Sequence, residues 1–229
     1  MQRFFDIIFS TLALLVLAPL LIPIIIILKF TGEGEIFFIQ QRVGKGGKMF
    51  GLIKFATMLK DSPNMGMGTI TIKNDSRVLP FGKFLRKTKI NELPQLINII
   101  KGDMSVIGPR PQDIRCFLVF NKEDQENIKK VRPGLSGIGS IVFRDEETIM
   151  DKIADKKNFY DNVISPYKGK LESWYFEHKS IGLYFKLIWL TIYVVIKSDA
   201  KINYKKLFDG FPNNPFDILG SSKNISYTY

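Results

Sequence analysis

The sequence predicts an α/β fold of mainly helical character whose N-terminal segment lies in a membrane. Three observations lead to this prediction: an uncharged apolar run at residues 7–28, two short strand-like runs after it, and apolar residues at helical spacing through much of the remainder. The chain has 229 residues, enough for one core with attachments. We therefore expect a membrane-embedded segment at 1–33, a globular domain at 34–198 and a loosely ordered polar tail at 199–229.

The composition narrows the classes of partner. The net charge is +11 and the sequence pI is about 9.6, which favours phosphates, nucleic acid or an anionic membrane surface. We do not expect a nucleic acid, because no recognition motif is present and aromatic residues do not alternate with the cations. The single cysteine, Cys116, excludes an internal disulfide, and the single histidine, His178, argues against a histidine metal site or a Ser-His-Asp triad.

The N-terminal apolar segment has two interpretations. Residues 7–28 carry no charge over a length that can span a bilayer core. Pro19 and Pro23 fall within it, and each removes a helical hydrogen bond and kinks or breaks the helix. The segment is therefore either a kinked transmembrane anchor or a re-entrant helix-break-helix hairpin that turns at Ala18–Pro19 and returns to the same face.

The residues after the membrane segment predict a pair of strands. Apolar runs at 36–39 and 50–55 flank a Lys-Gly-Gly-Lys turn. Lys54 in the second run is either a solvated strand residue or a ligand-binding cation. Further along the chain, we expect Asp75 and Arg77 to form an internal structural pair.

Two helices follow, separated by a short charged segment. The spacing of apolar residues predicts the first helix over 81–88. We expect the second helix to begin at Asn91 as its N-cap, with Pro94 in its first turn, and to end at Gly102. On this interpretation Asn91 and Glu92 form a helix cap whose carboxylate is favoured by the helix dipole.

The cations near Glu92 favour a binding site over a simple cap. Three of them lie within the six residues before it, and a rigid Gly-Pro-Arg-Pro turn follows at 108–111. Cations gathered around an acid can hold a diphosphate and a metal ion together, and a helix N-terminus also attracts phosphate. The three cations are Arg86, Lys87 and Lys89.

An apolar stretch at 181–197 is the second element that we expect to meet the membrane. It is short for a bilayer span and contains Lys186. Trp189 and Tyr193 are of the residue types that gather at the boundary between membrane and water. We expect an interfacial helix that lies in the plane of the head groups, with a buried core helix as the alternative.

In their order and spacing these motifs resemble the bacterial sugar transferases that move a sugar phosphate from a nucleotide sugar to polyprenyl phosphate. The likeness covers nearly the whole chain, including the lysine segment at 54–58, the acidic run, the Gly-Pro-Arg-Pro turn and an Arg-Pro-Gly-Leu-Ser-Gly element at 132–137. In that family an Asp-Glu pair is catalytic: the Asp attacks the phosphate that carries the sugar, and the Glu binds Mg²⁺. The resemblance implies that Glu92 is the catalytic acid and the metal ligand. It implies substrate-binding roles for Lys54, Arg86, Arg110 and Arg132.

The chain departs from the family pattern at its centre. Asn91 stands at the catalytic position where the family carries Asp, and Ala56 replaces a second cation near Lys54. An amide oxygen is neutral and a poor nucleophile, so three hypotheses remain open. In the first, Glu92 either takes over the attack or serves as base or metal ligand while the lipid phosphate attacks directly. In the second, the chain is an inactive relative. In the third, it belongs to a branch of the family with differently arranged chemistry.

The resemblance also implies a reaction and its setting. A sugar 1-phosphate passes from a UDP-sugar to undecaprenyl phosphate with release of UMP, which starts capsule, O-antigen or exopolysaccharide assembly. Expected partners are these two substrates, membrane lipid, a second copy of the chain and downstream glycosyltransferases, with Mg²⁺ as cofactor. The family favours the re-entrant N-terminal segment, with the catalytic domain on the cytoplasmic face of the bacterial inner membrane. The alternative function is a catalytically silent relative that binds nucleotide sugar or partner enzymes.

Overall fold

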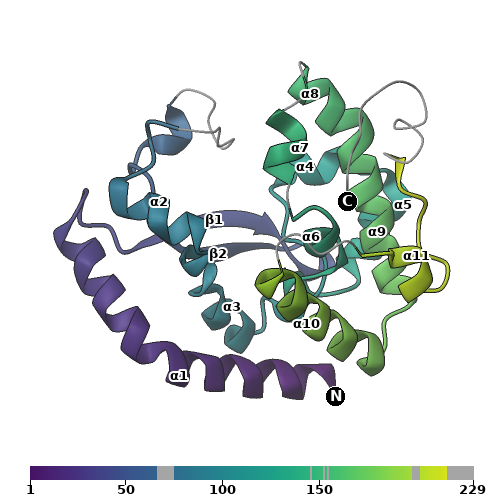
Figure 1. Ribbon diagram of the computed structural model, residues 1–229, viewed down its shortest axis with the longest axis horizontal. Coiled ribbons are helices and arrows are strands. Elements are labelled where there is room, and N and C mark those ends of the chain that lie inside the picture. Colours follow the sequence, from purple (N-terminus) through teal and green to yellow (C-terminus); the bar gives the residue numbers. More distant parts are fainter. Residues whose placement is uncertain (66–74, 145, 152, 154, 198–201, 216–229) are drawn as a thin grey trace. The chain divides into compact units, whose positions relative to one another are not determined.

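The chain forms two compact units, both of mainly helical character (Figure 1), which confirms the predicted α/β fold at this level. The N-terminal unit comprises residues 3–41 and 50–102, and the C-terminal unit comprises residues 1–2, 42–49 and 103–229. The computed structural model describes residues 1–65, 75–144, 146–151, 153, 155–197 and 202–215.

The N-terminal unit combines one long helix with paired strands and short helices. The two strands are hydrogen-bonded to each other, which confirms the predicted strand pair. The predicted helix over 81–88 is also confirmed. The elements in chain order are α1 (Gln2–Phe30), β1 (Phe37–Val43), β2 (Met49–Phe55), a 3-10 turn at Ser62–Asn64, α2 (Pro80–Lys87), a 3-10 turn at Ile90–Glu92, and α3 (Gln95–Lys101).

Helix α1 continues without interruption through Pro19 and Pro23. The predicted break into two helices is therefore wrong for this backbone, which instead forms one helix that bends along its length (Figure 1). Each proline removes one hydrogen bond, but the bonds of the neighbouring residues hold the helix together, so the outcome is a bend. Among the helices in the described part of the chain, α1 alone is long and apolar enough to cross a membrane.

The C-terminal half of α1 packs through apolar side chains. Leu21, Ile24 and Leu28 form a buried core with Phe55 of β2 and Leu85 of α2. These side chains leave water together, which is the main favourable term in holding the helix against the unit.

The N-terminal end of α1 is held by polar contacts with the same unit. Arg3 donates to the carbonyl oxygens of Ile99 and Ile100, the second at 2.8 Å. These carbonyls lie in the last turn of α3, where helical carbonyls have no partner within the helix and a cation is favoured. Asp6 and Ser10, on the following turns of α1, are buried. Both ends of α1 therefore contact the N-terminal unit.

The predicted pair of Asp75 and Arg77 is confirmed. Arg77 Nη2 lies 2.6 Å from Asp75 Oδ2, and both side chains are buried. Arg77 also donates to the backbone oxygens of Ser62 and Met65. The pair therefore holds together the two chain segments on either side of residues 66–74.

The C-terminal unit contains two short parallel strands and most of the helices. β3 (Ser105–Ile107) pairs with β4 (Gly134–Ser136), with Ser105 opposite Gly134 and Ile107 opposite Ser136. Its other elements are a 3-10 turn at Lys45–Gly47, α4 (Ile114–Val119), α5 (Lys122–Lys129), α6 (Ile138–Val142), α7 (Glu146–Asp151), α8 (Lys156–Phe159), a π-turn at Tyr160–Ile164, α9 (Ser165–Glu177), α10 (Ile181–Ile196) and α11 (Tyr204–Leu207).

Helix α10 matches the apolar stretch expected at 181–197 to within one residue. One face is buried, with Leu187 fully covered, while Trp189 is 70% exposed and Tyr193 is also exposed. The helix is therefore neither wholly core nor wholly surface. A helix that lies at the membrane surface needs an exposed apolar face, and α10 has one.

Part of the predicted loose tail is packed. Phe208, directly after α11, is buried and its ring lies 5.3 Å from that of Trp174 on α9. Trp174 Nε1 also donates to the carbonyl oxygen of Asp209 at 3.1 Å. The prediction of a loosely ordered tail is therefore wrong for residues 202–215, because aromatic side chains anchor them; residues 199–201 and 216–229 lie outside the described residues.

Candidate active site

Lys54 and Glu92 come together in the N-terminal unit. Lys54 Nζ lies 3.9 Å from Glu92 Oε1, and their side chains are 19% and 21% exposed. Lys54 is held in β2, and Glu92 ends the 3-10 turn that precedes α3. The structure therefore places a cation and an acid side by side, both within reach of a ligand from solvent.

A strained turn sets the position of Glu92. Lys89 has φ 59°, the one left-handed backbone among the described residues other than glycine, a conformation that costs a lysine roughly 1–2 kcal/mol. The carbonyl oxygen of Lys89 then accepts the Glu92 N–H at 3.1 Å. Helix α3 begins only at Gln95, with Pro94 as its N-cap. The prediction that Asn91 caps this helix is therefore wrong, because the chain first makes a separate 3-10 turn.

Asn91 is buried. It is the middle residue of the 3-10 turn at Ile90–Glu92 and is 7% exposed. Its Oδ1 is buried and accepts no hydrogen bond. A neutral amide oxygen is a poor nucleophile, and this one is also enclosed.

Arg86 belongs to the same unit as Lys54 and Glu92. It lies in the last turn of α2, just before the strained turn at Lys89, and its guanidinium is 3.8 Å from Met58 Sδ. This cation and the Lys54–Glu92 pair are thus carried by adjoining elements of one unit.

The C-terminal unit brings together the turns that carry Arg110 and Arg132. The Gly108 N–H donates to Ser136 O at 2.9 Å, and the Gly134 N–H donates to Pro109 O at 2.8 Å. The backbones meet so closely that a Cβ on Gly108 would lie 2.4 Å from the Arg132 carbonyl oxygen. The Gly-Pro-Arg-Pro and Arg-Pro-Gly motifs are therefore one rigid structure, although the two arginines are 22 positions apart in the sequence.

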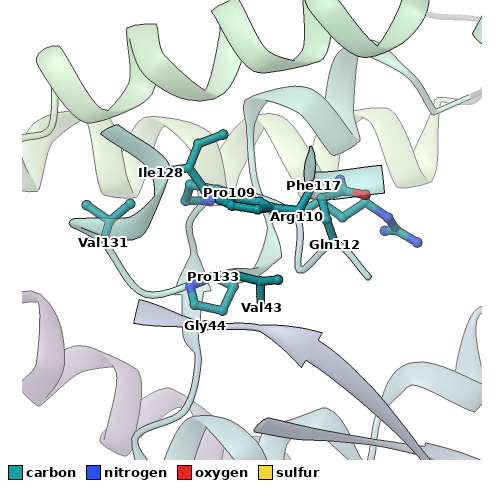
Figure 2. Close-up of a pocket in the computed structure, with 9 residues that line it drawn as sticks. All are labelled: Val43, Gly44, Pro109, Arg110, Gln112, Phe117, Ile128, Val131 and Pro133. Atoms are coloured by element: carbon teal, nitrogen blue, oxygen red, sulfur yellow. The ribbon is translucent and has the colours of Figure 1, made fainter. Parts of the chain in front are cut away.

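A small hollow adjoins these turns. Figure 2 shows the Arg110 guanidinium extending away from the apolar side chains that line it. The hollow encloses about 10 Å³, the space of roughly one water molecule. It is too small for a nucleotide sugar and is not by itself a substrate site. Its lining residues are Val43, Gly44, Pro109, Arg110, Gln112, Phe117, Ile128, Val131 and Pro133.

Sequence reasoning missed a buried acid behind Arg110. Glu172 on α9 accepts the Arg110 backbone N–H at Oε1, at 3.3 Å, while its Oε2 accepts no hydrogen bond. Burial raises the pKa of the Glu172 carboxyl to about 7, against the opposing effects of that N–H and of Lys168. The signal was weak, because Lys168 and Glu172 at i, i+4 have the spacing of an ordinary solvated ion pair on a helix. Lys168 instead pairs with Glu146, its Nζ 2.7 Å from Glu146 Oε2.

The described residues thus include one long apolar helix and a lysine beside a partly exposed carboxylate in a small domain. Residues 1–198 match the family described as bacterial sugar transferase. The chain therefore belongs to the bacterial sugar transferase family, which confirms the resemblance seen in its motifs.

Several curated relatives carry informative names. The UDP-N-acetylgalactosamine-undecaprenyl-phosphate N-acetylgalactosaminephosphotransferase of Aeromonas hydrophila is 37% identical over 62% of this chain and 34% of its own. The exopolysaccharide production protein ExoY of Sinorhizobium fredii is 32% identical over 70% of this chain and 77% of its own. The UDP-glucose:undecaprenyl-phosphate glucose-1-phosphate transferase of Escherichia coli is 32% identical over 84% of this chain and 39% of its own. The match thus spans most of ExoY but little more than a third of the other two relatives.

The raised pKa of Glu172 predicts a specific pH dependence of stability. The carboxyl holds its proton more tightly in the folded protein than at its ordinary value of 4.5, so its contribution to stability is complete below about pH 4.5 and is lost as the pH rises through about 7. The wild type should therefore lose up to about 3 kcal/mol of its free energy of unfolding between low and high pH, and Glu172→Gln should not show this loss. Chemical unfolding of wild type and Glu172→Gln at pH 5 and pH 8 measures the difference, with the exposed Glu123→Gln as control. Equal pH dependence in wild type and Glu172→Gln would contradict the assignment.

Burial of Asn91 predicts the effect of restoring the family's Asp. Asn91→Asp places a carboxylate where the buried oxygen has no donor, so it should lower the free energy of unfolding by about 1–3 kcal/mol. Transferase activity, measured as UMP release, should stay level or fall. The exposed Asn213→Asp is the matched control. A clear rise in UMP release by Asn91→Asp, from an undetectable wild-type rate, would show instead that Asn91 marks an inactivated enzyme.

Proposed function

We propose that this protein transfers a sugar 1-phosphate from a UDP-sugar to undecaprenyl phosphate, releasing UMP. The proximity of Lys54 and Glu92 carries the proposal, and the names of the relatives supply the substrate classes. An oxygen of the lipid phosphate ends bonded to the phosphorus that bears the sugar, and the bond from that phosphorus to UMP breaks. One phosphoanhydride replaces another, so catalysis consists chiefly of positioning and charge neutralisation.

Within this proposal Lys54 and Arg86 hold the diphosphate. Lys54 is partly exposed beside Glu92, and a cation there balances the charge that gathers on the departing UMP. Arg110 and Arg132 keep their predicted role in substrate binding, supported by the rigid turns on which the C-terminal unit presents them.

The residues present fit a divalent cation. Within the described part of the chain no group of three or more His, Cys, Asp and Glu side chains gathers, but Mg²⁺ in phosphoryl transfer commonly uses only one or two protein carboxylates, with water and substrate phosphate as its other ligands. Glu92 would hold it, because its carboxylate is partly exposed, whereas Asn91 Oδ1 is enclosed. When bound, Mg²⁺ supplies neutralisation of the diphosphate.

Asn91 leaves two routes for the attack. Either the Glu92 carboxylate attacks the sugar-bearing phosphorus, or the lipid phosphate attacks it directly. Asn91 is also the observation that favours the second candidate function, a silent relative that binds nucleotide sugar or partner enzymes. The two functions differ in one product, UMP.

We also propose that the protein lies on the cytoplasmic face of the inner membrane, with α1 re-entrant. A helix of 29 residues is about 43 Å long, more than the bilayer core of about 30 Å, so a spanning α1 would put its ends on opposite faces. Arg3 and Leu28 nevertheless both contact the N-terminal unit, which supports entry and exit on one face. Trp189 and Tyr193 of α10 support an interfacial position for that helix. A second copy of the chain and downstream glycosyltransferases remain predicted partners.

Topology can be tested by labelling the two ends of α1. In a Cys116→Ser background, Gln2→Cys and Thr31→Cys should both react with a membrane-impermeant thiol reagent from the cytoplasmic side only. The spanning alternative predicts that one of the two reacts from the opposite side, and that outcome would rule out re-entry.

The activity test uses the full chain with Mg²⁺, a UDP-sugar and undecaprenyl phosphate. We expect UMP release that requires the lipid, and a loss of about a thousandfold or more in Glu92→Gln, because the metal ion that neutralises the diphosphate loses its carboxylate ligand. Glu123→Gln, on the exposed side of α5, should retain the wild-type rate. If wild type releases no UMP across a panel of UDP-sugars while still binding one of them, the silent relative is the correct function.

A further inference from the structure

Asn98 of α3 is a buried polar residue outside the motifs described above. Its side-chain amide makes two hydrogen bonds with the backbone of β2: Oδ1 accepts the Ile53 N–H at 3.0 Å, and Nδ2 donates to Gly51 O at 2.8 Å. A neighbouring strand would use the same N–H and C=O groups. The Asn98 amide therefore makes the pair of hydrogen bonds that one residue of a neighbouring strand would make with β2.

This pairing links the two elements that carry the candidate active site. Ile53 directly precedes Lys54 in β2, and α3 follows Glu92 after only Leu93 and Pro94. Arg3 binds the carbonyls at the far end of α3. Asn98 thus hydrogen-bonds α3 to the strand beside Lys54.

We propose that Asn98 is a positioning residue, whose amide pairs with Gly51 and Ile53 of β2 and thereby holds Lys54 opposite Glu92. The inference rests on the proposed function, in which Lys54 binds the diphosphate of a sugar nucleotide and Glu92 holds the metal ion beside it. Only an amide of this length supplies both bonds. Asp offers acceptors alone and faces Gly51 O with a negative charge, and Leu leaves both backbone groups without a partner.

The first measurement concerns structure and does not depend on activity. In Asn98→Leu, the Ile53 amide should exchange its hydrogen at least about tenfold faster than in wild type, because it loses its acceptor. Ile99→Val is the matched control: it removes one buried methyl from the same helix and leaves both bonds to β2 in place. Should Asn98→Leu not fold, Asn98→Ala takes its place; it also removes the acceptor, so the same increase in Ile53 exchange is expected.

The second measurement is a double-mutant cycle on kcat/KM for UDP-sugar. Asn98→Leu alone should lower kcat/KM by about tenfold or more in protein that remains folded. In a Lys54→Met background the same change should have a much smaller effect, because the residue that it positions is already gone. A purely structural role predicts the same fold-change in both backgrounds, and so does not reproduce this result.

Each outcome decides a different point. Faster Ile53 exchange together with non-additive kcat/KM supports the positioning role. Unchanged Ile53 exchange, or equal losses with and without Lys54, overturns it. An inactive wild type would instead count against the proposed function; the cycle is then run on the Kd for UDP-sugar, with the same two outcomes.

Discussion

The candidate site depends on a charge pair that the surrounding structure holds in place. Lys54 and Glu92 lie 3.9 Å apart and are partly exposed, and such pairs contribute only about 0–1 kcal/mol to stability. The pair therefore does little to hold the fold together. Its alignment is maintained by contacts of the surrounding elements: the Asn98 amide on β2, Arg3 on the end of α3, and the apolar core around Leu85. Because the pair itself is weak, a diphosphate can replace one partner at low cost.

The arginine-bearing turns of the C-terminal unit use rigidity in a different way. Glycines allow backbone contact between β3 and β4, and prolines flank Arg110 and follow Arg132. Glu172 binds the Arg110 N–H from the buried side. With the backbone already fixed, only the arginine side chains are left to be ordered when they bind a phosphate, so more of the binding energy remains for the transition state.

The two departures from the family pattern have a common physical character. Asn91 and Ala56 are both buried, and together they replace one expected negative and one expected positive charge by neutral side chains. Removing both members of a set of buried charges is often neutral for stability, whereas restoring one alone leaves it uncompensated. This balance of charge favours a working branch of the family, in which the partly exposed Glu92 is the acid.

The sequence by itself determined the membrane-length helix, the strand pair, α2, the extent of α10, the Asp75–Arg77 pair and the family. These features follow from periodicity, charge and motif order, which can be read from residues close together in the sequence. Only the tertiary structure decided that α1 continues through its prolines, that residues 202–215 pack on Trp174, and that Asn91 is enclosed instead of capping a helix. It also revealed Glu172 and Asn98, whose partners lie 62 and 45 residues away. Burial and long-range hydrogen bonds depend on which segments meet, and no local pattern in the sequence records that.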